Sequence, residues 1–145
     1  MGSGKSFLSC CLANSIRIKY NLRCRFVSAV DYLAAVGDGY DRKGEPDPSA
    51  KYRECDLLIL DDLGAHKSGE WQVQEIFRLI DERMKASLAA IITANMPLDG
   101  QKIGERTVNR IYSKCVSFHL PEESIRAKIA QAENEKFLAE VLGKK

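Results

Sequence analysis

The chain begins with glycine, lysine and serine residues whose order suits the binding of phosphate. Gly4, Lys5 and Ser6 match the last three places of the phosphate-binding pattern G-x-x-x-x-G-K-[ST]. In such a loop the glycines let backbone N–H groups surround an anion, the lysine adds a positive charge, and the hydroxyl binds Mg²⁺. The residues predict a site for the phosphates of a nucleotide; the alternative reading is a flexible glycine–serine linker that precedes a helix.

A second group of polar side chains follows a short apolar run. The run Leu-Leu-Ile-Leu at residues 57–60 predicts a strand buried on both faces, and Asp61 and Asp62 come directly after it. Ligands of α/β proteins bind at the carboxyl ends of the strands. Asp61 is therefore predicted to hold Mg²⁺, and Asp62 to act as general base or to orient the attacking water. Two surface acids at a turn are the alternative.

The phosphate-binding pattern starts before the first residue of the chain. Its leading glycine and the strand that feeds it would precede Met1. We therefore expect a chain that is truncated within this loop and lacks the strand that feeds it; the family resemblance stated below implies that this first strand is central in the sheet. The apolar strands at 57–60 and 89–93 would then lose a ladder partner. On this expectation the 145 residues bind ATP weakly, hydrolyse it poorly and aggregate.

The elements that must position these residues alternate between helices and strands, which indicates a parallel sheet flanked by helices. Pro46, Pro48 and several glycines between residues 37 and 54 predict a mobile loop. Ser68 is expected to cap the helix that follows the two aspartates. Helices are expected over residues 5–20, 31–36, 69–87, 101–113 and 122–142, and strands over residues 23–28, 57–60, 89–93 and 115–120.

Composition limits the classes of function. A length of 145 residues suits one domain, and a formal net charge of +2 gives no strong signal for a polyanionic partner. The five cysteines include no C-x-x-C pair, which favours reduced thiols in a cytoplasmic protein over a zinc site. No apolar run is long enough to span a membrane.

The order of five motifs resembles one family. These motifs are GSGKS at residues 2–6, LLILDDLG at 57–64, ITAN at 92–95, GERTVNRI at 104–111 and SIR at 124–126. The chain is similar to AAA+ ATPases of the bacterial helicase-loader and transposition-helper type, the DnaC/IstB group. The resemblance covers essentially all of residues 1–145, which it identifies as an ATPase core that is incomplete at its N-terminus.

The resemblance implies a role for each matching residue. Asn95 corresponds to the first sensor of the outer phosphate, although an Asn-Met-Pro turn is an alternative reading. Arg110 corresponds to the arginine finger that reaches the nucleotide of a neighbouring subunit. Arg106 would share or support that role, and Arg126 corresponds to the second sensor; charged helix faces are the alternative for all three. ATP is implied to contact Gly2, Ser3, Gly4, Lys5, Ser6 and Phe7, and Mg²⁺ to contact Ser6 and Asp61.

The resemblance also implies a biological role. It points to an ATP-hydrolysing helicase loader in DNA replication, which self-associates when it binds ATP and grips the replicative helicase through a domain that is absent here. Tyr40, Arg42 and Lys43 lie where the family contacts single-stranded DNA, but the residues alone equally fit a solvated loop. The alternatives are a transposition helper ATPase and a catalytically inert nucleotide-binding module. A small-molecule kinase is disfavoured, because neither GERTVNR nor SIR supplies a lid or an acceptor site.

Overall fold

A computed structural model describes residues 4–41, 44, 46–66, 69–95, 97–120 and 131. Of the helix expected over residues 122–142, only residue 131 lies within these ranges, and Ser68, the expected cap, lies outside them. The elements in chain order are α1 (Lys5–Tyr20), β1 (Cys24–Ser28), α2 (Ala29–Asp41), α3 (Ala50–Glu54), β2 (Leu57–Asp61), α4 (Glu70–Lys85), β3 (Ala89–Ile92), α5 (Gly100–Ile103) and α6 (Glu105–Lys114). None of the helices in these ranges has both the length and the apolar character needed to cross a bilayer.

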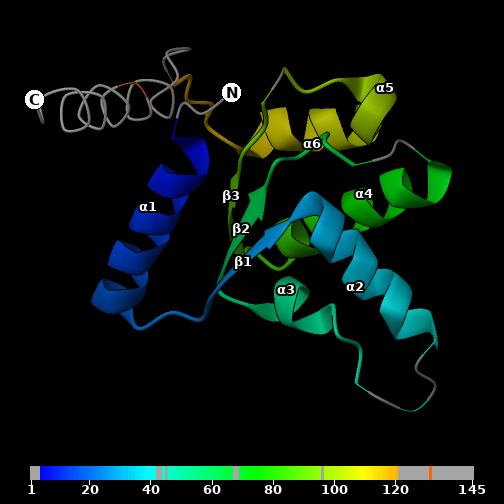
Figure 1. The fold of residues 1–145 in the computed structure, drawn as a ribbon, viewed down its shortest axis with the longest axis horizontal. Coiled ribbons are helices and arrows are strands. Elements are labelled where there is room, and N and C mark those ends of the chain that lie inside the picture. The colour runs from blue at the N-terminus through cyan, green and yellow to red at the C-terminus, as the bar shows by residue number, and fades with distance from the viewer. Residues whose placement is uncertain are drawn as a thin grey trace, which may run out of the picture.

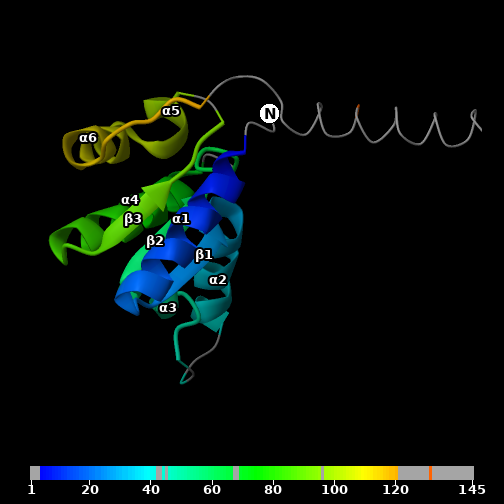
Figure 2. The same cartoon turned by 90° about the vertical axis from the view of Figure 1, so that its left-hand side faces the viewer.

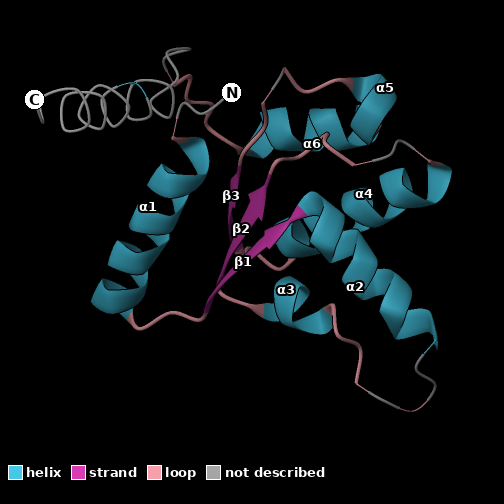
Figure 3. Cartoon of the chain, viewed as in Figure 1, coloured by secondary structure: helices cyan, strands magenta, loops and turns pink. Residues whose placement is uncertain are grey.

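The three strands form one parallel sheet in the order β1-β2-β3, with helices on both of its faces (Figures 1 and 3). This confirms the predicted fold class. Leu57 pairs in register with Cys24 on one side and with Ala89 on the other. All three strands therefore end at the same edge of the sheet, near which α5 and α6 lie (Figure 1).

Alternate residues of β2 face two separate apolar layers, as the period of a strand requires. Leu58 and Leu60 pack into the larger core, which contains residues of α2, α4 and α6. Leu57 and Ile59 pack with Ala13 of α1 into the smaller one. Helix α1 thus covers one face of the sheet, and α2, α3 and α4 cover the other (Figure 2).

The two apolar strands differ in burial because they differ in position. β2 is central, so the expectation that it lacks a ladder partner is wrong: residues 57–60 are each no more than 3% exposed. β3 has a neighbour on one side only within the described sheet. This agrees with the expectation that the strand at 89–93 lacks a ladder partner, and it leaves Ala89 and Ala90 exposed and Ile91 and Ile92 half-buried rather than buried.

The segment expected as a mobile loop contains helical turns. Helix α2 does not end at residue 36 but continues through Gly37 and Gly39 to Asp41, and α3 forms from Ala50 to Glu54. Glycine lowers helix propensity by only about 1 kcal/mol, which tertiary contacts can outweigh. Here Tyr32 of α2 packs edge-on against Tyr52 of α3, with the ring centroids 6.1 Å apart.

The C-terminal elements differ from expectation at three points. The helix expected over residues 101–113 is two helices, because Gly104 breaks it with φ 85° and ψ 134°. Residues 115–120 form no strand; a strand needs a ladder partner, and Val116 and Phe118 are instead 82% and 86% exposed. The N-cap position of α4 is Gly69.

Candidate functional site

Three chain segments meet at the edge where the strands end. They are the first turn of α1, the end of β2 and the residues that follow β3. Since Leu60 pairs in register with Ile92, the next residues, Asp61 and Thr93, also lie side by side. The N–H of Thr93 donates to the Leu60 carbonyl at 3.0 Å. Parallel pairing therefore carries the β3 residues to the two aspartates.

The carboxylate of Asp61 is the centre of this cluster. The Ser6 hydroxyl donates to Asp61 Oδ1 at 2.8 Å and lies 3.0 Å from Oδ2. From the other side, the Thr93 hydroxyl donates to Oδ1 at 2.6 Å. The structure therefore brings together the two residues that were predicted to share a metal ion, although they are 55 positions apart in the sequence.

The donor atoms around Asp61 fit Mg²⁺. They are carboxylate and hydroxyl oxygens, the ligands that hard divalent cations prefer, and Mg²⁺ usually takes only one or two carboxylates together with water and phosphate oxygens. The Ser6–Asp61 hydrogen bond holds the two side chains close together, and these are the two residues that would hold the ion. Ser6 and Asp61 are both half-buried, which leaves the site open to a phosphate.

Asp62 adopts a backbone conformation that is uncommon for residues other than glycine. Its φ is 56°, in the left-handed region, which Asp tolerates better than most residues. Its N–H donates to Thr93 Oγ1 at 2.9 Å, and its carboxylate accepts a hydrogen bond from the Asn95 side-chain amide. The structure therefore brings Asn95 to the predicted general base. A strained residue held by its surroundings is frequent at active sites.

Thr93 is a site residue that the sequence analysis did not single out. Its hydroxyl is the only atom in the described residues that hydrogen-bonds both to the Asp61 carboxylate and to the backbone of Asp62, and the residue is 7% exposed. The signal was available: Thr93 ends the strand expected over residues 89–93 and lies in the ITAN motif at residues 92–95. Its partners could be found only with the strand register.

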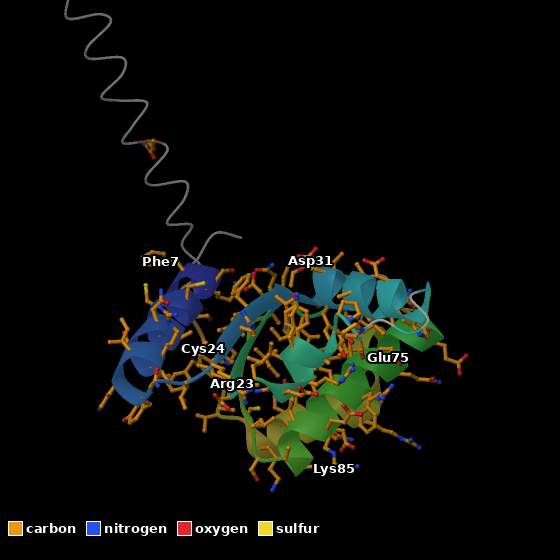
Figure 4. The ribbon with its side chains drawn as sticks, turned by 90° about the horizontal axis from the view of Figure 1, so that it is seen from below. Phe7, Arg23, Cys24, Asp31, Glu75 and Lys85 are labelled. Carbon is orange, nitrogen blue, oxygen red and sulfur yellow. The ribbon has the colours of Figure 1, made fainter. Side chains whose placement is uncertain are left out.

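The first turn of α1 faces the same edge. Gly4 is the N-cap with φ 81°, which suits glycine, and no described side chain caps the helix. The first turn of a helix presents backbone N–H groups and the positive end of the helix dipole, both of which attract an anion. Lys5 and Ser6 are half-buried. Phe7 is 76% exposed and lies on the outer side of the helix (Figure 4). Gly2 and Ser3 lie outside the described residues.

A hollow of about 330 Å³ adjoins the aspartates on the side of α5. Asp62 and Asn95 line it together with Asp99 and Lys102, and its apolar wall includes Leu63. A larger cavity of about 480 Å³ lies between α4, β3 and the residues after α6, and none of the predicted site residues lines it. The polar end of the sheet therefore has a hollow beside the predicted base.

The predicted arginines are not part of this cluster. The Nη2 atom of Arg110, on α6, lies 2.6 Å from Asp81 Oδ1 of α4. No hydrogen bond or ion pair in the described residues joins Arg110 to Ser6, Asp61, Asp62 or Asn95. Arg106 is exposed one helical turn earlier on α6, and Arg126 lies outside the described residues.

Comparisons with known proteins agree with this geometry. A family model described as "IstB-like ATP binding protein" matches residues 1–132. The crystal structure of the DnaC helicase loader has a TM-score of 0.75 and 24% identity, covering 83% of this chain and 73% of that one. A replication initiator DnaA bound to AMPPCP and single-stranded DNA has a TM-score of 0.72 and 21% identity, covering 94% of this chain and 43% of that one. These likenesses establish the P-loop AAA+ fold.

A curated relative is more similar in sequence. The chromosomal replication initiator DnaA of Burkholderia cenocepacia (strain HI2424) is 30% identical over 133 residues, which are 89% of this chain and 25% of the relative. The chain therefore spans about a quarter of the length of the curated relatives that it matches.

Proposed function

The chain belongs to the family of IstB-like ATP-binding proteins, and we propose that it is a Mg²⁺-dependent ATPase that acts as a helicase loader in DNA replication. The observation that carries the ATPase proposal is the joint position of Ser6, Asp61, Asp62 and Asn95 at one edge of the sheet. The metal-binding and water-positioning groups of a phosphoryl-transfer site are then in place beside the start of a helix.

Each group has a distinct part in this proposal. Residues 2–7 bind the nucleotide, with N–H groups of the first turn and the Lys5 ammonium on the phosphates. Ser6 and Asp61 hold Mg²⁺, which when bound neutralises charge that develops on the phosphate oxygens. Asp62 accepts a proton from, or orients, the attacking water, and Asn95 fixes the Asp62 carboxylate while it senses the outer phosphate. Arg126 would be the second sensor.

Arg110 completes the site from a second copy of the chain. Its position on α6, paired with α4 rather than with the cluster, supports supply in trans. An arginine that reaches the transferring phosphoryl group stabilises the transition state and has little effect on ground-state binding. Arg106, on the same helix, supports this contact. Residues 1–145 would then form an ATPase core that works as an oligomer.

Similarity to replication proteins favours the loader over the transposition helper. One similar protein, DnaC, is named a helicase loader, and another, DnaA, is named a chromosomal replication initiator. We propose a replicative helicase as partner, contacted outside this core, single-stranded DNA as a second ligand, and the cytoplasm as the location. Tyr40, Arg42 and Lys43 are the DNA contacts that we predict; the side chain of Tyr40 and both basic residues lie outside the described part of the structure.

The test of the ATPase proposal is hydrolysis by purified protein. The assays compare residues 1–145 with a version that is extended at its N-terminus to complete the pattern G-x-x-x-x-G-K-[ST]. Lys5→Ala and Asp61→Ala should abolish Mg²⁺-dependent ATP hydrolysis, whereas Lys19→Ala, an exposed residue in the last turn of the same helix, should not change it. Undiminished turnover by Lys5→Ala would exclude the proposed site.

A second assay separates the two biological roles. A loader should increase the binding of a replicative helicase to single-stranded DNA in an ATP-dependent reaction. A transposition helper should instead stimulate strand transfer by its transposase and leave helicase loading unchanged. The second result would replace the loader by the helper without affecting the ATPase proposal.

A further inference from the structure

Two cations share one aspartate between α4 and α6. Asp81 Oδ1 lies 2.6 Å from Arg110 Nη2, and Asp81 Oδ2 lies 2.6 Å from the Lys85 ammonium. The Asp81 side chain is only 10% exposed, whereas those of Arg110 and Lys85 are 43% and 70% exposed. Lys85 lies at the last turn of α4, on the surface (Figure 4). The carboxylate is thus the fixed member of the group, and the two cations are at its solvent side.

The position of Asp81 is fixed by packing. Its neighbours Leu79 and Ile80 belong to the main core, and so does Ile111, the residue next to Arg110. Helices α4 and α6 therefore meet through buried side chains, and close-packed interiors allow little sliding of one element against another. The carboxylate is held at a constant place relative to the backbone of Arg110.

The contact leaves most of the guanidinium available. Arginine has five N–H donors in a planar fork, and the ion pair with Asp81 occupies the Nη2 end. The exposed remainder can bind a phosphate at the same time. A long side chain that is free in solution samples many rotamers and must be ordered on binding. An ion pair at one end limits the rotamers that the side chain samples and so removes part of this cost.

We propose that Asp81 is a positioning residue that holds Arg110 in the orientation needed to contact the phosphates of a nucleotide bound by a neighbouring copy of the chain. This inference rests on the proposed function, because it requires that Arg110 acts in trans. Asp81 acts through Arg110 and does not touch the nucleotide. The proposal assigns Asp81 no role in positioning Arg106, which lies one turn earlier on α6.

The experiment mixes two kinds of defective subunit. Lys5→Ala subunits cannot use their own nucleotide but can supply Arg110. Arg110→Ala subunits bind nucleotide but supply no arginine. The proposed function predicts that the mixture hydrolyses ATP, although neither variant does so alone. A mixture that forms mixed oligomers and remains inactive would refute the supply of Arg110 in trans, and with it the basis of this inference.

Asp81→Ala is then placed in one kind of subunit at a time. In the Lys5→Ala subunits, which supply Arg110, it should lower the restored kcat about 10- to 100-fold, the usual effect of losing a group that orients a ligand. In the Arg110→Ala subunits, which supply the nucleotide site, it should change neither kcat nor KM. Equal effects in both places would show a merely structural role. A higher rate with the arginine donors would show that Asp81 restrains Arg110. No change in either place would show that Asp81 does not act on Arg110. Each of the last three results would overturn the proposal.

Conservative variants keep the result interpretable if Asp81→Ala unfolds the subunit. Asp81→Asn keeps the size but loses the charge, and it should lower the restored rate when placed in the arginine donors. Lys85→Ala removes the other partner of Asp81 and should leave the restored rate unchanged. Loss of the rate with Lys85→Ala but not with Asp81→Asn would refute the proposal. Thermal unfolding of each variant confirms that the compared subunits are folded.

Discussion

Thr93→Val should weaken both the fold and the ATPase site, because one hydroxyl bonds to both aspartates. Valine keeps the shape of the side chain but loses the donor to Asp61 at 2.6 Å and the acceptor for the Asp62 N–H at 2.9 Å. A hydrogen bond to a charged group contributes about 1.5–3 kcal/mol, and a buried donor without a partner costs about 1–3 kcal/mol. Since Asp61 and Asp62 are half-buried, water can take the place of the lost hydrogen bonds in part. We therefore expect the free energy of unfolding to fall by about 2–4 kcal/mol.

The loss is measurable by unfolding and by hydrolysis. At roughly 3 °C per kcal/mol for a chain of this size, Thr93→Val should lower Tm by about 6–12 °C. The expected fall in ATP turnover is larger than stability alone explains, because Asp61 and Asp62 lose the contact that orients them. Thr93→Ser keeps the hydroxyl and should retain most of the turnover.

A second threonine supplies the matched control. Thr107 is fully buried on α6, and its hydroxyl has no hydrogen-bond partner among the described residues. Thr107→Val should therefore leave Tm unchanged or raise it, since it removes a buried polar group that has no partner. If Thr93→Val unfolds at the same temperature as the wild type and hydrolyses ATP at the same rate, the role given to Thr93 is refuted.

Two further predictions concern stability and are measured by urea unfolding. Gly104→Ala should lower the free energy of unfolding by about 1–3 kcal/mol, because φ is 85° and the new Cβ would lie 2.8 Å from Val73 Cγ1. Gly37 lies in a helix, and a Cβ there would meet nothing within 4 Å, so Gly37→Ala should raise the free energy of unfolding by about 0.5–1 kcal/mol. Equal effects of the two substitutions would contradict the argument from backbone conformation. Arg83→Met should lower the free energy of unfolding by about 3 kcal/mol or more, because each buried carbonyl that loses its hydrogen-bond partner costs about 1–3 kcal/mol. The buried guanidinium of Arg83 donates to the carbonyls of Tyr52, Arg53, Cys55 and Ala89. A neutral Arg83→Met would show that water or rearrangement satisfies these carbonyls.

The sequence alone predicted the elements whose signals are local. The apolar run at residues 57–60 indicated a buried strand, and the helical spacing after Gly4 indicated a helix that ends at Tyr20; both are confirmed. The motifs predicted Ser6, Asp61 and Asp62 as site residues, and the family resemblance added Asn95. In the structure Ser6 contacts Asp61 and Asn95 contacts Asp62. Residue type and short-range periodicity are properties of a few neighbouring positions, so a single chain displays them directly.

The tertiary structure decided what depends on residues far apart in the sequence. Whether β3 is central or at an edge depends on which strands pair with it, and residues 115–120 have strand-like residues but no ladder partner. The contacts of Thr93 with both aspartates follow from the β2–β3 register. The pairing of Asp81 with Arg110 follows from the packing of α4 on α6. Each of these contacts joins segments that are far apart in the sequence, and no local pattern of residues predicts which segments will meet. The contacts form because burial and strand pairing of the whole chain stabilise them.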